Sequence, residues 1–242
     1  MKIHIMNDKN ELNRASAQHI IACVNEKPNA VLSLATGSSP LGIYDVLIED
    51  HKENGTSYNQ VITFNLDEYV GIDQSHNQSY YQYMQKNIFG SIDINPLNIH
   101  MPNANHIEDV DACLAYNNAL DKHVIDLQLL GLGSNGHIGF NEPGTPFDSK
   151  THIIKLDAKT RKDNARFFDQ LEDVPTHAIT MGISNIMAAK KIVLVAMGSK
   201  KAQAVYDMIH GDITTDLPAS ILQKHPNVEL YIDKEAATLL AK

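Results

Sequence analysis

The sequence of 242 residues has few cysteines and no long apolar run, and each absence excludes a class of protein. Only two cysteines occur, Cys23 and Cys113, which excludes a disulfide framework and predicts free thiols in a reducing compartment. No apolar run reaches the length of about 18 residues that could cross a membrane, and the first residues are too polar for a signal peptide. We therefore expect a cytoplasmic protein with no membrane partner.

Positive charge is also scarce. The chain has 20 Lys and Arg against 29 Asp and Glu, a formal net charge of −9. This balance excludes a nucleic-acid backbone as the partner, so an anionic small molecule would need a local basic pocket. The His, Cys and acidic residues show no tight ligand spacing, so we predict no metal and no cofactor.

No Pro-, Gly- or Ser-rich linker, repeat or low-complexity tract divides the chain, so we predict one domain spanning residues 1–242. Apolar runs alternate with segments of helical period. This alternation predicts an α/β, Rossmann-like fold, with a doubly wound, mainly parallel sheet and helices on both faces. The predicted strands are residues 2–6, 30–35, 61–66, 98–101, 124–130, 152–156, 178–181, 192–197 and 229–232. The predicted helices are residues 9–25, 41–52, 79–88, 109–123, 158–171, 184–190, 200–209, 219–223 and 234–242.

The most informative segment is residues 131–143, with the sequence GLGSNGHIGFNEP. It follows the predicted buried strand 124–130, and open α/β sheets bind ligands at the carboxyl ends of their strands. Bare glycine backbone there lets a small ligand approach closely, and His137 and Glu142 stand beside it as a candidate acid/base pair. This combination is typical of a catalytic site.

The same segment matches G-x-G-x-x-G, the fingerprint of dinucleotide-binding folds. That fingerprint requires a following helix and an acidic residue about 20 positions further on. Here Pro143 and Pro146 prevent a helix of useful length, and the residue near the required position is Lys155. We therefore exclude a nucleotide site.

Three further groups of polar residues are expected at the same edge of the sheet. Residues 36–42 (TGSSPLG) lead into a helix, which is typical of a phosphate site and equally of an ordinary Ser/Thr cap. Asp67 and Glu68 leave the strand 61–66. A buried carboxylate there can move a proton between neighbouring carbons, although a capping role is the alternative. The candidate phosphate cations are Arg161, Lys162, Arg166, Lys200 and Lys201. Taken alone, each of them is better explained as a solvated surface residue.

Together these segments resemble the glucosamine-6-phosphate deaminase family, part of the glucosamine/galactosamine-6-phosphate isomerases, in its short bacterial form. The resemblance runs from residue 1 to about the last helix. It rests on residues 36–42, FNLDEY at 64–69, residues 131–143 and GSKKA at 198–202, in this order and spacing. Family members convert glucosamine 6-phosphate and water to fructose 6-phosphate and ammonia in amino-sugar catabolism. The 6-phosphogluconolactonases share the broader fold but not the full GHIGFNEP block together with DEY.

The resemblance implies a role for each matching residue. Asp67 would be the general base of enolisation, carrying a proton between C2 and C1 of the opened sugar. His137 would help to open the ring through the ring oxygen, oriented and tuned by Glu142. The implied phosphate ligands are Gly37, Ser38, Ser39, Arg166 and Lys201.

Asn135 departs from many family members, which have Asp there. Asn can hydrogen-bond the imidazole but cannot offset imidazolium charge, so ring opening would depend on Glu142. The short bacterial members share this Asn, and we expect activity to be retained.

A second departure concerns regulation. The longer, hexameric members bind N-acetylglucosamine 6-phosphate at an inter-subunit site lined by Arg, Lys and Thr. The matching positions here are His152, Ile154 and Lys155, which would pair poorly with that effector's phosphate. We predict no such activation, and the oligomeric state stays open between a monomer and a homo-oligomer.

Two other functions remain open at this stage. The sequence does not determine the C4 epimer, so galactosamine 6-phosphate is an alternative substrate. A sugar-phosphate sensor would bind its ligand without turnover. The sensor is disfavoured because phosphate binding requires none of Asp67, His137 and Glu142.

Overall fold

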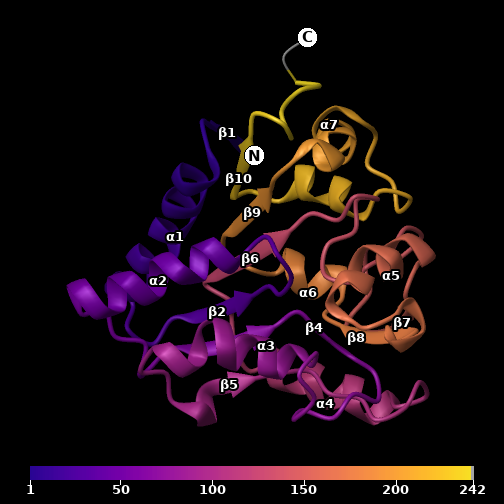
Figure 1. Cartoon of the computed structure of the whole chain (residues 1–242), viewed down its shortest axis with the longest axis horizontal. Helices are drawn as coiled ribbons and strands as arrows, with labels where there is room; N and C mark the ends of the chain where they lie inside the picture. The colour runs from indigo at the N-terminus through magenta and orange to yellow at the C-terminus, as the bar shows by residue number, and fades with distance from the viewer. Residues whose placement is uncertain (241–242) are drawn as a thin grey trace.

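The computed structural model describes residues 1–240, and its centre is a sheet of seven strands that all pair in parallel (Figure 1). The strand order is β1-β10-β9-β6-β2-β3-β5. Its strands are β1 (Lys2–Met6), β2 (Val31–Leu34), β3 (Ile62–Asn65), β5 (Ile99–His100), β6 (Leu127–Gly131), β9 (Ile192–Ala196) and β10 (Val228–Asp233). The predicted mainly parallel α/β sheet is confirmed.

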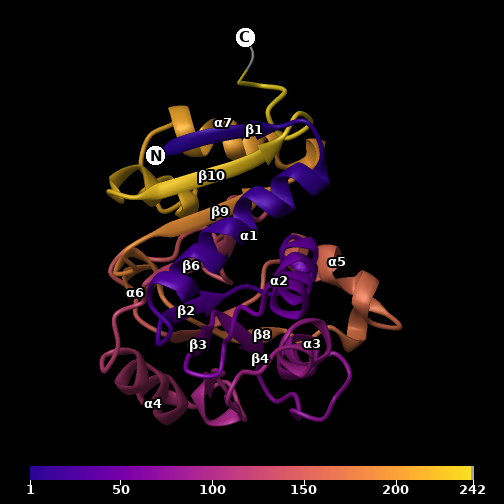
Figure 2. The ribbon, with the colours of Figure 1, turned by 90° about the vertical axis from the view of Figure 1, so that its left-hand side faces the viewer.

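Helices cover both faces of this sheet, and Figure 2 views it from the side of α1 and α2. Alternate strand residues serve the two faces: Val193 and Val195 pack with α1, α2 and α3, whereas Ile192 and Leu194 pack with α4, α6 and α7. The helices are α1 (Lys9–Glu26), α2 (Leu41–Asn54), α3 (Tyr80–Asn87), α4 (Val110–Leu120), α5 (Ala158–Asn164), α6 (Ile183–Met187) and α7 (Ala202–His210).

Local sequence signals set the helix starts. Asp8 caps α1 by accepting a hydrogen bond from the Glu11 N–H at 2.9 Å, and Ser79 caps α3 by accepting from the Gln82 N–H at 3.1 Å. Both capping residues are of the types that favour a helix start, which is why the beginnings of these helices were predictable.

The strand order changes direction between β2 and β6. From β2 the chain continues to β3 on one side, whereas from β6 the sheet continues to β9 and β10 on the other. The loops that leave β2 and β6 therefore diverge and leave a crevice at the carboxyl edge, the usual place for a ligand in an open α/β sheet.

A second, smaller sheet was not predicted. It consists of β4 (Asp67–Tyr69), β8 (His177–Thr180) and β7 (His152–Lys155), all antiparallel. The chain leaves the central sheet at Leu66, whose carbonyl accepts a hydrogen bond from the Met181 N–H at 2.7 Å. Asp67 then pairs with Thr180. The predicted strands 152–156 and 178–181 thus belong to this sheet, which lies with α5 to the right in Figure 1.

Three predicted helices differ from the structure. The helix expected over 158–171 ends at Asn164, because Phe168 adopts an extended backbone and packs against Tyr69 with ring centroids 5.7 Å apart. Residues 218–224 form a 3₁₀ helix, η6 (Pro218–Lys224), in place of an α-helix at 219–223. Residues 234–240 of the predicted last helix form turns, and residues 241 and 242 lie outside the described residues.

Candidate active site

The loop between β2 and α2 forms one wall of a cavity at the crevice. Pro40 stands at the start of α2, and no side chain caps this helix, so its first N–H groups have no capping partner. The alternative of an ordinary Ser/Thr cap is therefore wrong. The Gly37 carbonyl accepts a hydrogen bond from the Tyr83 hydroxyl at 2.6 Å, which holds the loop from the side of α3. A helix start with free amides and two serines fits an anion.

Asp67 begins β4 and lines the cavity while being 5% exposed. Thr36 donates a hydrogen bond to its Oδ1 at 3.4 Å. Burial raises the pKa of Asp67 to about 8, the neighbouring charge of Glu68 acts in the same direction, and the Thr36 hydrogen bond opposes both. The helix-capping alternative is wrong for Asp67, because it lies in a strand. A carboxyl group with this pKa exchanges its proton near neutral pH.

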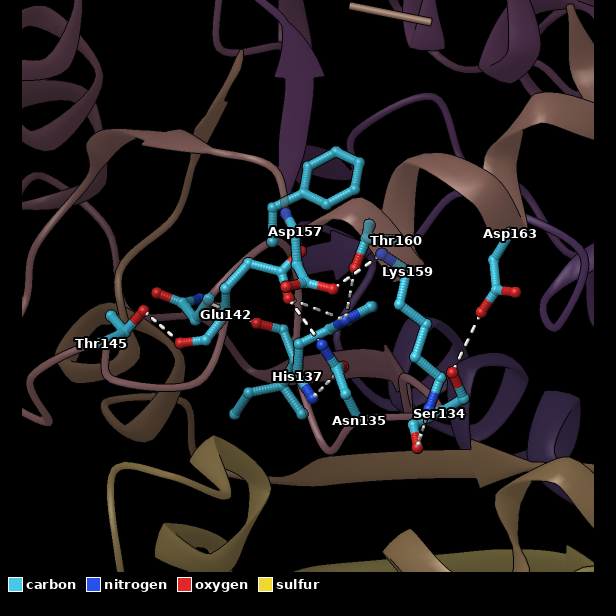
Figure 3. A network of polar contacts seen from close by, with 12 residues as sticks. Ser134, Asn135, His137, Glu142, Thr145, Asp157, Lys159, Thr160 and Asp163 are labelled. Atoms are coloured by element: carbon cyan, nitrogen blue, oxygen red, sulfur yellow. Dashed lines mark hydrogen bonds and ion pairs between the residues drawn. The ribbon is translucent and has the colours of Figure 1, made fainter. Parts of the chain in front are cut away.

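His137 also lines the cavity, in the loop after β6, and Figure 3 shows it among its polar neighbours. Its Nδ1 is 3.5 Å from Oε2 of Glu142 and 3.4 Å from the hydroxyl of Thr160. Asn135 donates to the same Glu142 oxygen at 2.8 Å, and its own carbonyl accepts from the His137 N–H at 3.3 Å. Glu142 and Thr160 contact the imidazole, whereas Asn135 does not hydrogen-bond the ring as expected but holds Glu142 and the His137 backbone.

Glu142 remains ionised although it is buried. Burial acts to raise its pKa, but the hydrogen bond and charge of His137, with hydrogen bonds from Thr160 and Asn135, lower it to about 2. The Asp157 N–H also donates to Oε1 at 3.2 Å. Glu142 therefore keeps a negative charge beside the imidazole ring of His137.

Two glycines of the predicted Gly-rich segment are required by close approach. A Cβ at Gly133 would lie 2.5 Å from the His137 ring. Gly139 has a φ of +58°, and a Cβ there would lie 3.0 Å from Oγ1 of Thr180 and 3.6 Å from Oδ2 of Asp67. Gly133 is therefore required by the His137 ring, and Gly139 by its positive φ and the close approach of Thr180.

Cations meet the β2–α2 loop from two other segments. Arg166 follows α5, and its Nη2 donates to Oγ of Ser38 at 3.0 Å. Lys201 follows β9 at the start of α7. Burial lowers the pKa of Lys201, Arg166 lowers it further, and Asp163 opposes the change. This clustering of positive charge beside free amides suits a phosphate dianion.

The cavity has a volume of about 770 Å³. The predicted residues that line it are Gly37, Ser38, Ser39, Asp67, His137, Lys162, Arg166, Lys200 and Lys201. Arg161 does not line it, because its Nη2 donates to the carbonyls of Leu171 and Val174 at 3.2 and 2.8 Å. Of the five candidate cations, Arg161 is the one that lies outside the cavity, whereas Arg166 and Lys201, the phosphate ligands that the resemblance implies, line it.

Thr160 and Tyr80 are among the lining residues that the sequence analysis missed. Thr160 on α5 contacts His137, and Tyr80 at the start of α3 lies beside Asp67. No local sequence pattern marked either residue as part of the site. Each lies on a helix and reaches the cavity only because the folded chain brings that helix beside another segment. Among residues 1–240, no group of three or more His, Cys, Asp or Glu is arranged to hold a metal ion.

Acid/base groups and an anion-binding wall share one cavity, which places the chain among enzymes that act on small anionic substrates. Residues 7–231 match the family of glucosamine-6-phosphate isomerases and 6-phosphogluconolactonases, and the chain belongs to this family. It is 48% identical over 242 residues to a glucosamine-6-phosphate deaminase of Halalkalibacterium halodurans, covering 100% of this chain and 98% of that protein. It is 47% identical over 241 residues to the glucosamine-6-phosphate deaminase of Clostridium novyi, covering 99% of this chain and 100% of that one.

Solved structures agree with this assignment. A monomeric glucosamine-6-phosphate deaminase superposes with a TM-score of 0.97 at 42% identity, covering 99% of this chain and 100% of that one. The 6-phosphogluconolactonase from Trypanosoma cruzi superposes with a TM-score of 0.82 at 18% identity, covering 100% and 97%, and this likeness shows the fold alone. Within residues 1–240, no helix is long and apolar enough to span a membrane.

Proposed function

We propose that the protein converts glucosamine 6-phosphate and water to fructose 6-phosphate and ammonia. The observation that carries the proposal is the buried Asp67, with its pKa raised to about 8, in one cavity with His137 and the cationic wall. The full-length deaminase relatives at 47–48% identity favour deamination over the lactonase chemistry that occurs in the same family.

The substrate phosphate would bind at the start of α2. Its dianion would accept hydrogen bonds from the amides and hydroxyls of Gly37, Ser38 and Ser39, with Arg166 and Lys201 as charge partners. Anchoring this remote group supplies binding energy that orients the reacting carbons at the other end of the sugar.

Ring opening would fall to His137. It would give a proton to the ring oxygen and take the proton that the C1 hydroxyl loses, so that the C1–O5 bond breaks and an aldehyde forms. Glu142 contacts the ring of His137 and is itself held by Asn135, so an ionised carboxylate lies beside the ring. The charge that Asn135 cannot supply is supplied by Glu142.

Asp67 would carry out the isomerisation. Ionised Asp67 would take the proton from C2, a C1–C2 double bond would form, and the C1 oxygen would take a proton from water. Asp67 then returns its proton to C1, which leaves an imine at C2. Water adds to this imine and ammonia departs, giving the ketose. Proton transfer by a positioned group contributes roughly 10²–10⁴-fold to the rate.

The test is ammonia release from glucosamine 6-phosphate by the native protein and by Asp67→Asn. Galactosamine 6-phosphate and 6-phosphogluconolactone serve as comparison substrates. We expect release from the glucosamine compound and a loss of roughly 10²–10⁴-fold in the variant. Native-rate turnover by Asp67→Asn would remove Asp67 from the mechanism, and turnover of the lactone alone would overturn the proposed activity.

We further propose that the enzyme acts as a cytoplasmic monomer without activation by N-acetylglucosamine 6-phosphate. A phosphorylated substrate and the two free cysteines, Cys23 and Cys113, support a reducing intracellular compartment. The likeness to a monomeric deaminase supports the monomer. His152, Ile154 and Lys155 lie on β7 and provide few groups for a second phosphate.

A further inference from the structure

Glu68 is a buried carboxylate that takes no direct part in the proposed reaction. It follows Asp67 in β4 and is 2% exposed. Because side chains alternate along a strand, the two carboxylates point to opposite sides of β4. Asp67 lines the cavity, whereas Glu68 faces the start of α3.

Three backbone N–H groups donate to Glu68. Those of Tyr69 and Tyr80 reach Oε1, both at 2.9 Å, and that of Tyr81 reaches Oε2 at 3.0 Å. Burial raises the pKa of Glu68, and these N–H groups oppose the change. Each partner is a donor, so a proton on this carboxyl group would find no acceptor among them. The start of a helix also favours negative charge, so the surroundings of this carboxyl group favour its ionised form.

We propose that Glu68 is a positioning residue for the proton transfer. Its buried charge maintains the proton affinity of Asp67, and its hydrogen bonds hold α3, with Tyr80, against the cavity. The inference rests on the proposed function, because it concerns the base of that reaction.

The other groups packed around Asp67 carry no charge at neutral pH, so Glu68 is the charged neighbour among them. The titratable groups that face Asp67 from the packed elements are the phenols of Tyr69 from β4, Tyr80 from α3 and Tyr116 from α4. These phenols are neutral at neutral pH because burial raises the pKa of each. Thr36 contributes a neutral hydroxyl. On the cavity side, His137 and Lys201 remain in place in every variant used below.

The test is the pH dependence of kcat/KM for glucosamine 6-phosphate in the native protein and in Glu68→Gln. The substitution preserves the size of the side chain and removes its charge. We expect the acidic limb of the profile to move to lower pH by about one unit or more. The plateau falls as well, because a weaker base accepts the C2 proton less readily. A folded Glu68→Gln protein whose limb coincides with the native one would overturn the inference.

Ser79→Ala is the matched control. Ser79 caps α3 by accepting from the Gln82 N–H at 3.1 Å, and its hydroxyl donates to the Gln74 carbonyl at 2.9 Å. Its removal loosens the start of the same helix without changing any charge. We expect a lower Tm and an unchanged acidic limb. A limb displaced as far as that of Glu68→Gln would assign the effect to helix position and overturn the electrostatic role.

Glu68→Asp carries the test if Glu68→Gln does not fold. It retains the charge on a shorter side chain, so its limb stays at the native pH while its stability falls. A limb at lower pH in this variant would contradict the inference. Native protein that releases no ammonia would overturn the proposed function itself, whereas an active native protein with coincident limbs would overturn this inference alone.

Discussion

Two buried carboxyl groups of the cavity region, Asp67 and Glu142, have pKa values displaced in opposite directions. Burial and the adjacent charge of Glu68 raise that of Asp67 to about 8. Burial acts on Glu142 as well, but His137 and the donors around it lower its pKa to about 2. Groups whose environments separate their pKa values in this way divide the work of acid/base catalysis between them. In the proposed reaction Asp67 would exchange a proton, and Glu142 would serve as a fixed charge.

The raised pKa of Asp67 has a consequence for stability. The folded protein binds this proton more tightly than the unfolded chain, whose Asp has a pKa near 3.8, so stability from this group falls as pH rises from about 4 to about 8. We expect Asp67→Asn to raise Tm most at pH 9 and least at pH 5. Each kcal/mol gained in the free energy of unfolding should raise Tm by about 2–4 °C. Thermal unfolding followed by circular dichroism measures it. Asp148→Asn, at an exposed carboxylate, is the control, and an equal gain at both pH values would contradict the burial argument.

Arg166 allows a test of the anion wall. Its guanidinium donates to Ser38 and stands beside Lys201, so Arg166→Ala removes a charge partner of the proposed phosphate. We expect KM for glucosamine 6-phosphate to rise roughly 10- to 100-fold, the equivalent of losing a hydrogen bond to a charged group. Steady-state kinetics measure it, with Arg14→Ala outside this cavity as the control. Unchanged KM would place the phosphate elsewhere.

At the scale of elements, loops from the central sheet and the first strand of the small sheet meet at one edge. The loops after β2 and β6 diverge at the point where the strand order reverses, and β4 leaves the central sheet there to pair with β8. The antiparallel sheet carries Asp67 on one edge strand, and α5 follows its other edge strand, β7. The position of this small sheet therefore affects the distance between Asp67 and Arg166, whereas Lys201 follows β9 of the central sheet.

Gly139 lies in the loop after β6, where its backbone packs against Thr180 of β8 in the small sheet. Gly139→Ala would strain a residue with a φ of +58° and press a Cβ toward Thr180 and Asp67. We expect a loss of about 1–3 kcal/mol in stability together with a reduced kcat. Gly144→Ala is the matched control, because Gly144 has a φ of +93° with no atom near a Cβ. Denaturant unfolding and kinetics compare the two; equal kcat values would exclude a role for Gly139 in placing Asp67.

At the scale of the whole molecule, the two sheets share contacts across Leu66 and Met181. We predict that residues 1–242 unfold as one cooperative unit. Near-UV circular dichroism of the nine tyrosines and far-UV circular dichroism of the backbone should give coincident denaturation curves. Separate transitions would divide the chain into two domains.

Sedimentation measures the mass in solution and checks the proposed monomer. Assays of ammonia release with and without N-acetylglucosamine 6-phosphate check the proposed absence of activation.

Local periodicity was enough to predict the class of fold. Apolar runs between segments of helical period identified the strands of the parallel sheet. The capping residues Asp8 and Ser79 stand near the predicted helix starts. The Gly-rich segment 131–143 predicted a ligand-binding edge, and prolines there excluded a nucleotide-binding helix. These signals are local because backbone hydrogen bonding and side-chain alternation repeat within a few residues.

The second sheet, the exclusion of Arg161 and the contact of Thr160 with His137 could not be predicted in this way. Each depends on residues that are distant in sequence, such as the pairing of Asp67 with Thr180. The chain by itself determined which chemical groups are available and which strands carry them. Only the tertiary structure decided which carboxyl group is buried beside a charge and which beside donors, because desolvation and Coulomb interactions depend on distances that the folded chain alone defines.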